Sequence, residues 1–321
     1  MYNADQKKQF IKQYTEKESI EKACVALFNA LEASEELWGA DISTVDANRA
    51  KVAIENVVGM RMDSITQRVA ILRQYAKWCL EQGKPNACDA LLKVEVSGDA
   101  KMRKHTVKNP KHLQSYLDTL CDPESEQKVD NVIRCYFWLA YAGLGEEDAL
   151  RVNAKDVDLT RMVITLDNRQ YILPRESFAA ITNCATLKYF RFDHPNYAAT
   201  GPVNRDRAPG DKILRGVRSE PTADIIRSIV SRAARVAARS NKTDLRLSYF
   251  RVWLSGLFYR IYEDDVAGII DAHTAFIHYV EEEERRKDPK LDMTDKAQRT
   301  RILHVANTYF RDYKRWKATL Q

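Results

Sequence analysis

Apolar positions recur at helical spacing along most of this 321-residue chain. The stretch SITQRVAILRQYAKWCLEQGK (64–84) begins with Ser64 as a predicted cap, places its apolar side chains on one face, and ends near Gly83. Residues 18–34, 44–58 and 86–94 repeat this spacing, and no strand pattern interrupts them. The first hundred residues therefore predict a small helical bundle.

The period of the pattern changes once, in RMVITLDNRQYILP (161–174). Two short alternating runs flank Asp167-Asn168, which predicts a β-hairpin ending at Pro174. Helical spacing dominates before and after it, with predicted helices at 112–120, 127–144, 175–190, 225–239, 244–265, 266–286 and 295–320. The expected fold is mainly α with one small β-sheet, in the α+β class.

Composition shifts divide the chain into four expected parts. Residues 1–95 form a helical domain, and residues 96–110 form a basic linker that lacks an apolar period. Residues 111–285 form a second domain, and residues 286–321 form a C-terminal helix. The apolar stripe of that helix must be buried in this chain or in a neighbour, so it is a candidate oligomerisation segment.

The composition, 45% hydrophobic and 30% charged, is typical of a soluble globular protein. No apolar run reaches membrane-spanning length, and the polar start MYNADQKKQF lacks the apolar stretch of a signal peptide. The six scattered cysteines are expected to be free thiols in the cytoplasm. The histidines show no metal-ligand spacing, so neither a metal nor another cofactor is expected.

The net charge of +6 is modest, and the cations gather in four stretches: 101–112, 204–218, 225–239 and 311–317. In the helix at 225–239, Arg227, Arg232, Arg235 and Arg239 fall within an arc of about 140°. Such clusters can be separate solvated faces. They can also form one footprint for phosphates if the fold brings them together.

One segment resembles a known family. AGLGEEDALRVNAKDVD (142–158) aligns without a gap on the pattern T-G-L-R-x-S-E-L-x-x-L-x-x-x-D-I-D of the tyrosine recombinases, or phage integrases. Asp148 stands for the glutamate, and the other matches are Gly143, Leu144, Asp156 and Asp158. The hairpin also follows where that family has its sheet. The resemblance implies an N-terminal core-binding domain of the SAM-like type and a recombinase-type catalytic fold that clamp duplex DNA.

In that family a tyrosine attacks the scissile phosphate and forms a 3′-phosphotyrosine, two arginines hold the phosphate oxygens, and a hairpin lysine and a histidine assist. On this chain the first arginine falls on Gly145, and the hairpin offers only Arg169. The second arginine falls on Arg251, but its histidine partner falls on Ser248. Tyr279, 28 residues after Arg251, resembles the nucleophile.

Many family members have a histidine nine residues before the tyrosine, where this chain has Ile269-Ile270. The resemblance therefore leaves at most Arg251 and Tyr279 of the catalytic set, as relics. Loss of one arginine costs on the order of 10²–10³ in rate, so loss of several groups predicts that turnover is abolished.

Three hypotheses follow. The first is a recombination-deficient, sequence-specific binder of double-stranded DNA, similar to temperate-phage repressors built on this fold. It would be encoded by a bacterium or a phage, and would be associated with the nucleoid. The second is an active recombinase acting through Tyr279. The third is a helical protein–protein interaction module. For the first, the expected DNA contacts are Lys101, Arg103, Lys104, Lys108, Arg205, Arg207, Arg215, Arg218, Arg227, Arg235 and Arg251.

Overall fold

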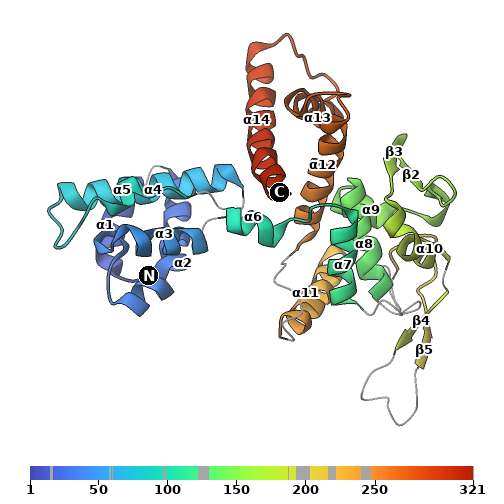
Figure 1. Cartoon of the computed structure of the whole chain (residues 1–321), viewed down its shortest axis with the longest axis horizontal. Coiled ribbons are helices and arrows are strands. Elements are labelled where there is room, and N and C mark those ends of the chain that lie inside the picture. Colours follow the sequence, from blue (N-terminus) through green and yellow to red (C-terminus); the bar gives the residue numbers. More distant parts are fainter. Residues whose placement is uncertain are drawn as a thin grey trace. The chain divides into compact units, whose positions relative to one another are not determined.

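A computed structural model describes residues 1–14, 17–57, 59, 61–96, 99–121, 130–186, 188–192, 203–215, 222–239 and 247–320. The chain divides into two compact units, and Figure 1 labels the helices and strands of both. Unit 1 contains Met1–Met102 and Leu303–Arg315, and unit 2 contains Arg103–Ile302 and Trp316–Gln321. Within the described residues, no helix is both long enough and apolar enough to span a membrane.

Unit 1 is helical, as its apolar spacing predicts. Its helices are α1 (Ala4–Ile11), α2 (Glu18–Trp38), α3 (Ala47–Val57), α4 (Met62–Glu81) and α5 (Ala90–Lys93), joined by short 3-10 turns at Lys12–Tyr14 and Ile42–Thr44. Phe10, Phe28 and Tyr75 pack edge to face at its centre, with ring centroids 4.9–6.1 Å apart. The predicted cap of α4 is wrong, because the helix begins at Met62, two residues before Ser64.

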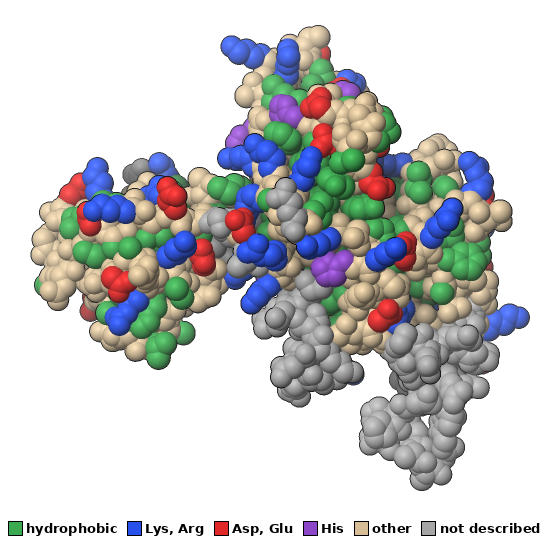
Figure 2. All heavy atoms as spheres, viewed as in Figure 1, with side chains coloured by type: hydrophobic (Ala, Val, Ile, Leu, Met, Phe, Trp, Pro, Cys, Tyr) green, Lys and Arg blue, Asp and Glu red, His purple; other side chains and the backbone are tan. Residues whose placement is uncertain are grey.

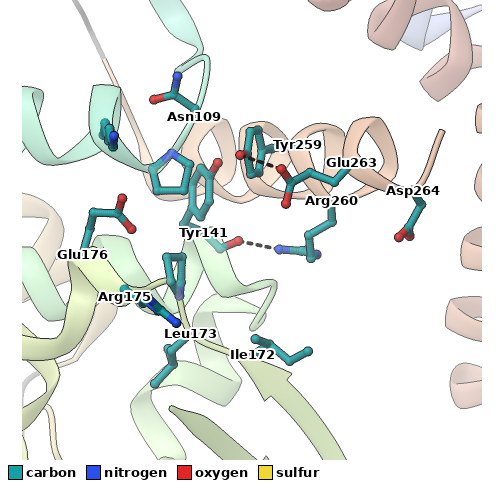
Figure 3. Close-up of a pocket in the computed structure, with 13 residues that line it drawn as sticks. Asn109, Tyr141, Ile172, Leu173, Arg175, Glu176, Tyr259, Arg260, Glu263 and Asp264 are labelled. Carbon is teal, nitrogen blue, oxygen red and sulfur yellow. Dashed lines mark hydrogen bonds between the residues drawn. The ribbon is translucent and has the colours of Figure 1, made fainter. Parts of the chain in front are cut away.

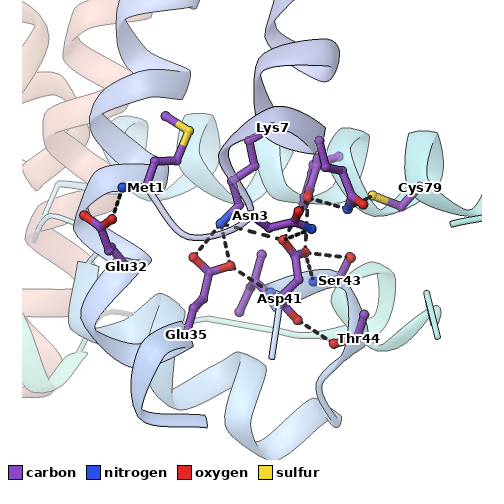
Figure 4. Close-up of polar contacts among 12 residues, drawn as sticks. Met1, Asn3, Lys7, Glu32, Glu35, Asp41, Ser43, Thr44 and Cys79 are labelled. Carbon is purple, nitrogen blue, oxygen red and sulfur yellow. Dashed lines mark hydrogen bonds and ion pairs between the residues drawn. The ribbon is translucent and has the colours of Figure 1, made fainter. Parts of the chain in front are cut away.

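A buried polar network fixes α1 in unit 1 (Figure 4). The Lys7 ammonium, 0% exposed, donates to Glu35 Oε1 at 2.6 Å, and the Ile42 backbone N–H donates to the same oxygen at 2.9 Å. Asp41 lies 3.8 Å from the Lys7 ammonium and accepts hydrogen bonds from the Tyr75 hydroxyl at 3.1 Å. Burial raises the pKa of the Glu35 carboxyl more than Lys7 lowers it. The network therefore depends on a single buried cation.

The C-terminal helix α14 (Lys296–Ala318) contributes Leu303–Arg315 to unit 1. The Asp312 carboxylate is fully buried, accepts the Met62 backbone N–H at 2.7 Å at the start of α4, and pairs with Arg61. The Arg61 guanidinium also lies 4.7 Å from the Tyr309 ring centroid. Ile302, Ala306 and Tyr313 of the α14 stripe are buried within the same chain, whereas Val305 is exposed. The structure gives no support to the predicted use of this stripe between protomers.

The core of unit 2 forms around α8 (Asp130–Ala142) and α12 (Tyr249–Val266), which pack against each other. The two backbones meet at Gly256, where an added Cβ would lie 2.0 Å from the Tyr141 carbonyl oxygen. The helices α7 (Pro110–Leu120), α9 (Glu146–Arg151), α10 (Phe178–Thr186), α11 (Ala223–Arg239) and α13 (Ala272–Lys287) complete the unit. Helix α7 begins at Asn109, whose side chain accepts the His112 N–H at 2.9 Å.

The predicted hairpin is confirmed. Strands β1 (Val157–Asp158), β2 (Val163–Leu166) and β3 (Arg169–Ile172) form an antiparallel sheet in the order β1-β2-β3. Asp167 and Asn168 both have positive φ, 49° and 63°, as a two-residue hairpin turn requires. The fold class, mainly helical with a small sheet, is therefore as predicted.

Three elements were missed by the sequence pattern. Strands β4 (Tyr189–Phe192) and β5 (Val203–Asp206) pair within the polar stretch that follows α10. The expected linker contains α6 (Asp99–His105), because Met102 and the following Val107 supply two fully buried anchors among polar residues.

Candidate nucleic-acid interface

The segment that resembles the recombinase motif forms the turn from α8 to α9. Gly143 has φ +105°, and the N–H groups of Gly143 and Leu144 close the end of α8 on the Ala140 and Leu139 carbonyls at 2.9 and 3.1 Å. Leu144 is fully buried, and its carbonyl accepts the Tyr249 hydroxyl at 2.9 Å. The next residue, Gly145, is thereby held at the N-cap of α9 with an ordinary φ of −63°. Position 145 therefore does not require glycine for its backbone conformation.

The first turn of α9 is acidic, with Glu146, Glu147 and Asp148. Glu146 accepts hydrogen bonds from the Tyr136 hydroxyl and from Arg227, whose Nε lies 2.9 Å from Glu146 Oε1. Burial tends to raise the pKa of the Glu146 carboxyl, but Arg227 and Tyr136 outweigh it and the pKa is lowered. Arg227, which was predicted to contact DNA, is thus paired with the Glu146 carboxylate.

A pair of carboxylates on α13 binds Arg169, the cation of the hairpin. Arg169 donates to Glu283 at 2.8 Å and lies 3.5 Å from Glu282, both on α13. Arg286 of the same helix lies 3.8 Å from Asp148 and 2.8 Å from Glu283. Arg169 is therefore neutralised by acidic side chains.

Ser248 is exposed and precedes α12, and Arg251 lies in the first turn of that helix. The half-buried Arg251 guanidinium is 2.8 Å from Nδ1 of His105 on α6. Burial lowers the pKa of Arg251. The spacing of the family motif did not reveal His105, because this histidine comes from the segment predicted as a linker.

Tyr279 is half-buried on α13, and its ring centroid lies 6.1 Å from that of Trp253. The Trp253 indole N–H donates to the Gly143 carbonyl at 3.1 Å. The structure thus ties Tyr279 through Trp253 to the turn that carries Gly145. Arg251, two residues before Trp253 on α12, reaches His105 instead.

The predicted DNA contacts are placed as follows. Lys101 is half-buried and donates to the Asn56 carbonyl at 2.8 Å. Arg103 and Lys104 on α6 are exposed, and Lys108 is half-buried. Arg215 is half-buried against the Ala208 and Gly210 carbonyls. Arg227 and Arg235 on α11 are exposed. Arg218 and the side chain of Arg205 lie outside the described residues.

The prediction for Arg207 does not fit the structure. Arg207 is 6% exposed, and its guanidinium donates to the Cys184 and Ile213 carbonyls, each at 2.6 Å. Burial lowers the pKa of Arg207. It is a structural residue that closes the loop after β5, so we remove it from the interface.

On the face shown in Figure 2, the basic and acidic side chains of unit 1 are interspersed. The basic helix α11 is the clearest candidate surface in unit 2, with Arg227, Arg232 and Arg235 exposed on it. Across the described ranges, no three histidine, cysteine, aspartate or glutamate side chains are grouped so that they could hold a metal ion. All six cysteines are free, and only Cys88 is not buried.

Comparison with known proteins supports part of this picture. Residues 1–81 match the family described as "MrpR, N-terminal core-binding domain", which confirms the predicted core-binding domain. The chain is also similar to the structure described as "Structure of the Tn1549 transposon Integrase (aa 82-397) in complex with circular intermediate DNA (CI5-DNA)". That match has 14% identity, covers 81% of this chain and 86% of that chain, and has a TM-score of 0.35. No curated protein sequence matches the chain.

Proposed function

We propose that this chain, whose N-terminal unit matches the MrpR core-binding domain, binds double-stranded DNA sequence-specifically on a tyrosine recombinase scaffold that no longer cuts. In this proposal the protein is a regulator of the repressor type, encoded by a phage or another mobile element. It needs no metal or other cofactor, because the family's chemistry is carried by side chains alone.

The observation that carries the proposal is the replacement of phosphate-binding groups by carboxylate ion pairs. Gly145 offers no side chain, acidic residues follow it in the first turn of α9, and Arg169 is held by Glu283 and Glu282. A transferring phosphate develops negative charge, which preorganised cations stabilise and carboxylates repel. A site of this composition disfavours strand cleavage, whereas a binding surface built from many phosphate contacts tolerates the loss.

A second candidate, an active strand transferase, is favoured by one observation. His105 stands beside Arg251, and Tyr279 is retained. A histidine at that place could supply the proton transfer that Ser248 cannot. This candidate predicts a covalent protein–DNA adduct, and the first does not.

DNA binding itself is tested on α11. Arg227→Ala is expected to weaken binding to a duplex selected by the full-length protein from a random pool. It should also reduce the slope of log K against log salt by about 0.9, because one phosphate contact is lost. The measurement is a mobility-shift titration at several salt concentrations. Lys290→Ala, in the exposed loop before α14, is the control and should leave the slope unchanged. An unchanged slope in Arg227→Ala would place the DNA elsewhere.

A substitution at Glu146 is expected to have the opposite effect, a rise in DNA affinity. Glu146→Gln keeps a hydrogen-bonding side chain beside Arg227 but removes the negative charge near the proposed phosphate path. Affinity for the same duplex should rise about threefold to tenfold at low salt, and the gain should shrink as salt rises. If Glu146→Gln weakens binding, the carboxylate orients Arg227 for DNA instead of competing with it.

A further inference from the structure

Unit 2 contains a cavity of about 720 Å³, and none of the residues assigned above to DNA lines it (Figure 3). Four segments line it: the start of α7, the end of α8, the chain from Ile172 to Glu176 after β3, and one face of α12. Its volume is within the range of sites for small organic molecules. All of its lining residues belong to unit 2, so the cavity is complete within that unit.

Two of its lining side chains have incomplete polar partners: Arg260 has no paired carboxylate, and the Tyr141 hydroxyl has no acceptor, among the described residues. The Arg260 guanidinium donates to the Tyr141 carbonyl, with Nη1 2.5 Å from the oxygen, and no carboxylate of the described residues lies within 4.0 Å of it. Burial lowers the pKa of Arg260 to about 10. The Tyr141 hydroxyl is buried without a hydrogen-bond partner in the described part of the chain, on a residue that is 2% exposed. Arg260 is a partly buried cation, and both it and Tyr141, whose hydroxyl lacks an acceptor, line the cavity, so each favours an anionic acceptor there.

Gly143 and the Tyr141 carbonyl position the Arg260 guanidinium. Its Nη2 would lie 2.7 Å from a Cβ at Gly143, so the absence of a side chain there makes room for the guanidinium. One arm of the fork is fixed on the Tyr141 carbonyl. The guanidinium is thus positioned before any ligand arrives, which lowers the entropic cost of binding.

The rest of the cavity is apolar with a mixed rim. Ile172, Leu173, Pro174 and Pro110 supply apolar surface, and Ile172 is 72% exposed. Lys111 and Arg175 are exposed lining residues, and the lining also includes the acidic side chains Glu176, Glu263 and Asp264. Glu263 accepts the Tyr259 hydroxyl at 2.8 Å. These carboxylates would repel a polyanion, so the cavity does not suit a nucleic-acid backbone.

We propose that this cavity binds a small amphipathic carboxylate. Its carboxylate would accept hydrogen bonds from Arg260 and the Tyr141 hydroxyl, and its apolar body would lie against Ile172, Leu173 and the two prolines. The site is independent of the proposed function, because no residue assigned to DNA lines it.

The first probe is anilinonaphthalene sulfonate, an amphipathic aromatic anion whose fluorescence rises on binding, titrated into the full-length protein. Phenylbutanoate is then added as a competitor, beside its neutral amide, phenylbutanamide. We expect one saturable site, displacement by the acid, and displacement at least about tenfold weaker by the amide, because a hydrogen bond to a charged group is lost. Equal displacement by acid and amide, or none by either, would overturn the proposal.

Variants separate this site from general surface binding. Ile172→Asp should weaken probe binding at least about tenfold, whereas Ile269→Asp, which alters an equally exposed isoleucine outside the cavity, should not. Tyr141→Phe should weaken binding of the acid about tenfold without lowering the melting temperature, because the hydroxyl has no partner in the free protein. Equal binding by the two aspartate variants, or unchanged binding by Tyr141→Phe, would contradict the proposal.

Discussion

Gly256→Ala is expected to lower the stability of unit 2 by about 3 kcal/mol. The new Cβ would lie 2.0 Å from the Tyr141 carbonyl oxygen and 2.8 Å from its carbonyl carbon, so α8 and α12 must move apart. These atoms are backbone and cannot rotate away. The higher helix propensity of alanine returns only about 1 kcal/mol. The same carbonyl accepts Arg260, so the cavity wall should loosen as well.

Circular dichroism melting and hydrogen exchange of peptides from α8 and α12 measure this effect. Gly145→Ala is a matched control, because its φ is ordinary and its Cβ would meet only Asp148 Oδ2 at 3.4 Å. That variant should change the free energy of unfolding by about 0.5 kcal/mol at most. Equal melting temperatures of the two variants would show that α8 and α12 are packed less closely than in the structure.

Lys7→Met is expected to destabilise unit 1 by about 3–5 kcal/mol at neutral pH, because it leaves buried carboxylates without their cation. Glu35 is 0% exposed and Asp41 is 5% exposed. Burial already raises the pKa of Glu35. A carboxyl whose pKa is raised by folding favours the folded state at low pH and disfavours it as pH rises. The deficit of the variant should therefore shrink as the pH falls from about 8 to about 5.

Hydrogen exchange of peptides from α2 and α4 reports this change within unit 1. Lys51→Met, on the exposed face of α3, is the control and should be nearly neutral. Adding Glu35→Gln to Lys7→Met should recover part of the loss, because the amide oxygen still accepts the Ile42 N–H and carries no charge. A deficit that stays constant with pH, or no recovery in the double variant, would show that the network is not governed by Lys7.

The helices and the hairpin could be predicted because each follows a local pattern. The Asp167-Asn168 turn needs two residues that tolerate positive φ, and the sequence offers them between two alternating runs. Helix α6 has no such local pattern, since its burial depends on Met102 and Val107 meeting distant side chains. Strands β4 and β5 pair within a polar stretch, and such a stretch gives little sign of strand pairing.

Site prediction from sequence was limited in the same way. Alignment with the family motifs located Gly145, Ser248 and Arg251, because their positions follow from spacing along the chain alone. It could not show that Glu283 neutralises Arg169, or that His105 stands beside Arg251, because these partners are 114 and 146 residues away along the chain. Arg207 illustrates the opposite error, since a charge run does not reveal which of its cations is buried.

The most direct test of the central claim pairs two assays on one DNA. The duplex selected by the full-length protein is prepared as a series of suicide substrates, each with a nick beside a different phosphate. Each is examined by mobility shift and by denaturing gel. The account predicts a specific shift with every substrate that retains the site, and no gel-stable adduct with any of them. A covalent adduct that disappears in Tyr279→Phe would contradict it, and would make the chain an active recombinase.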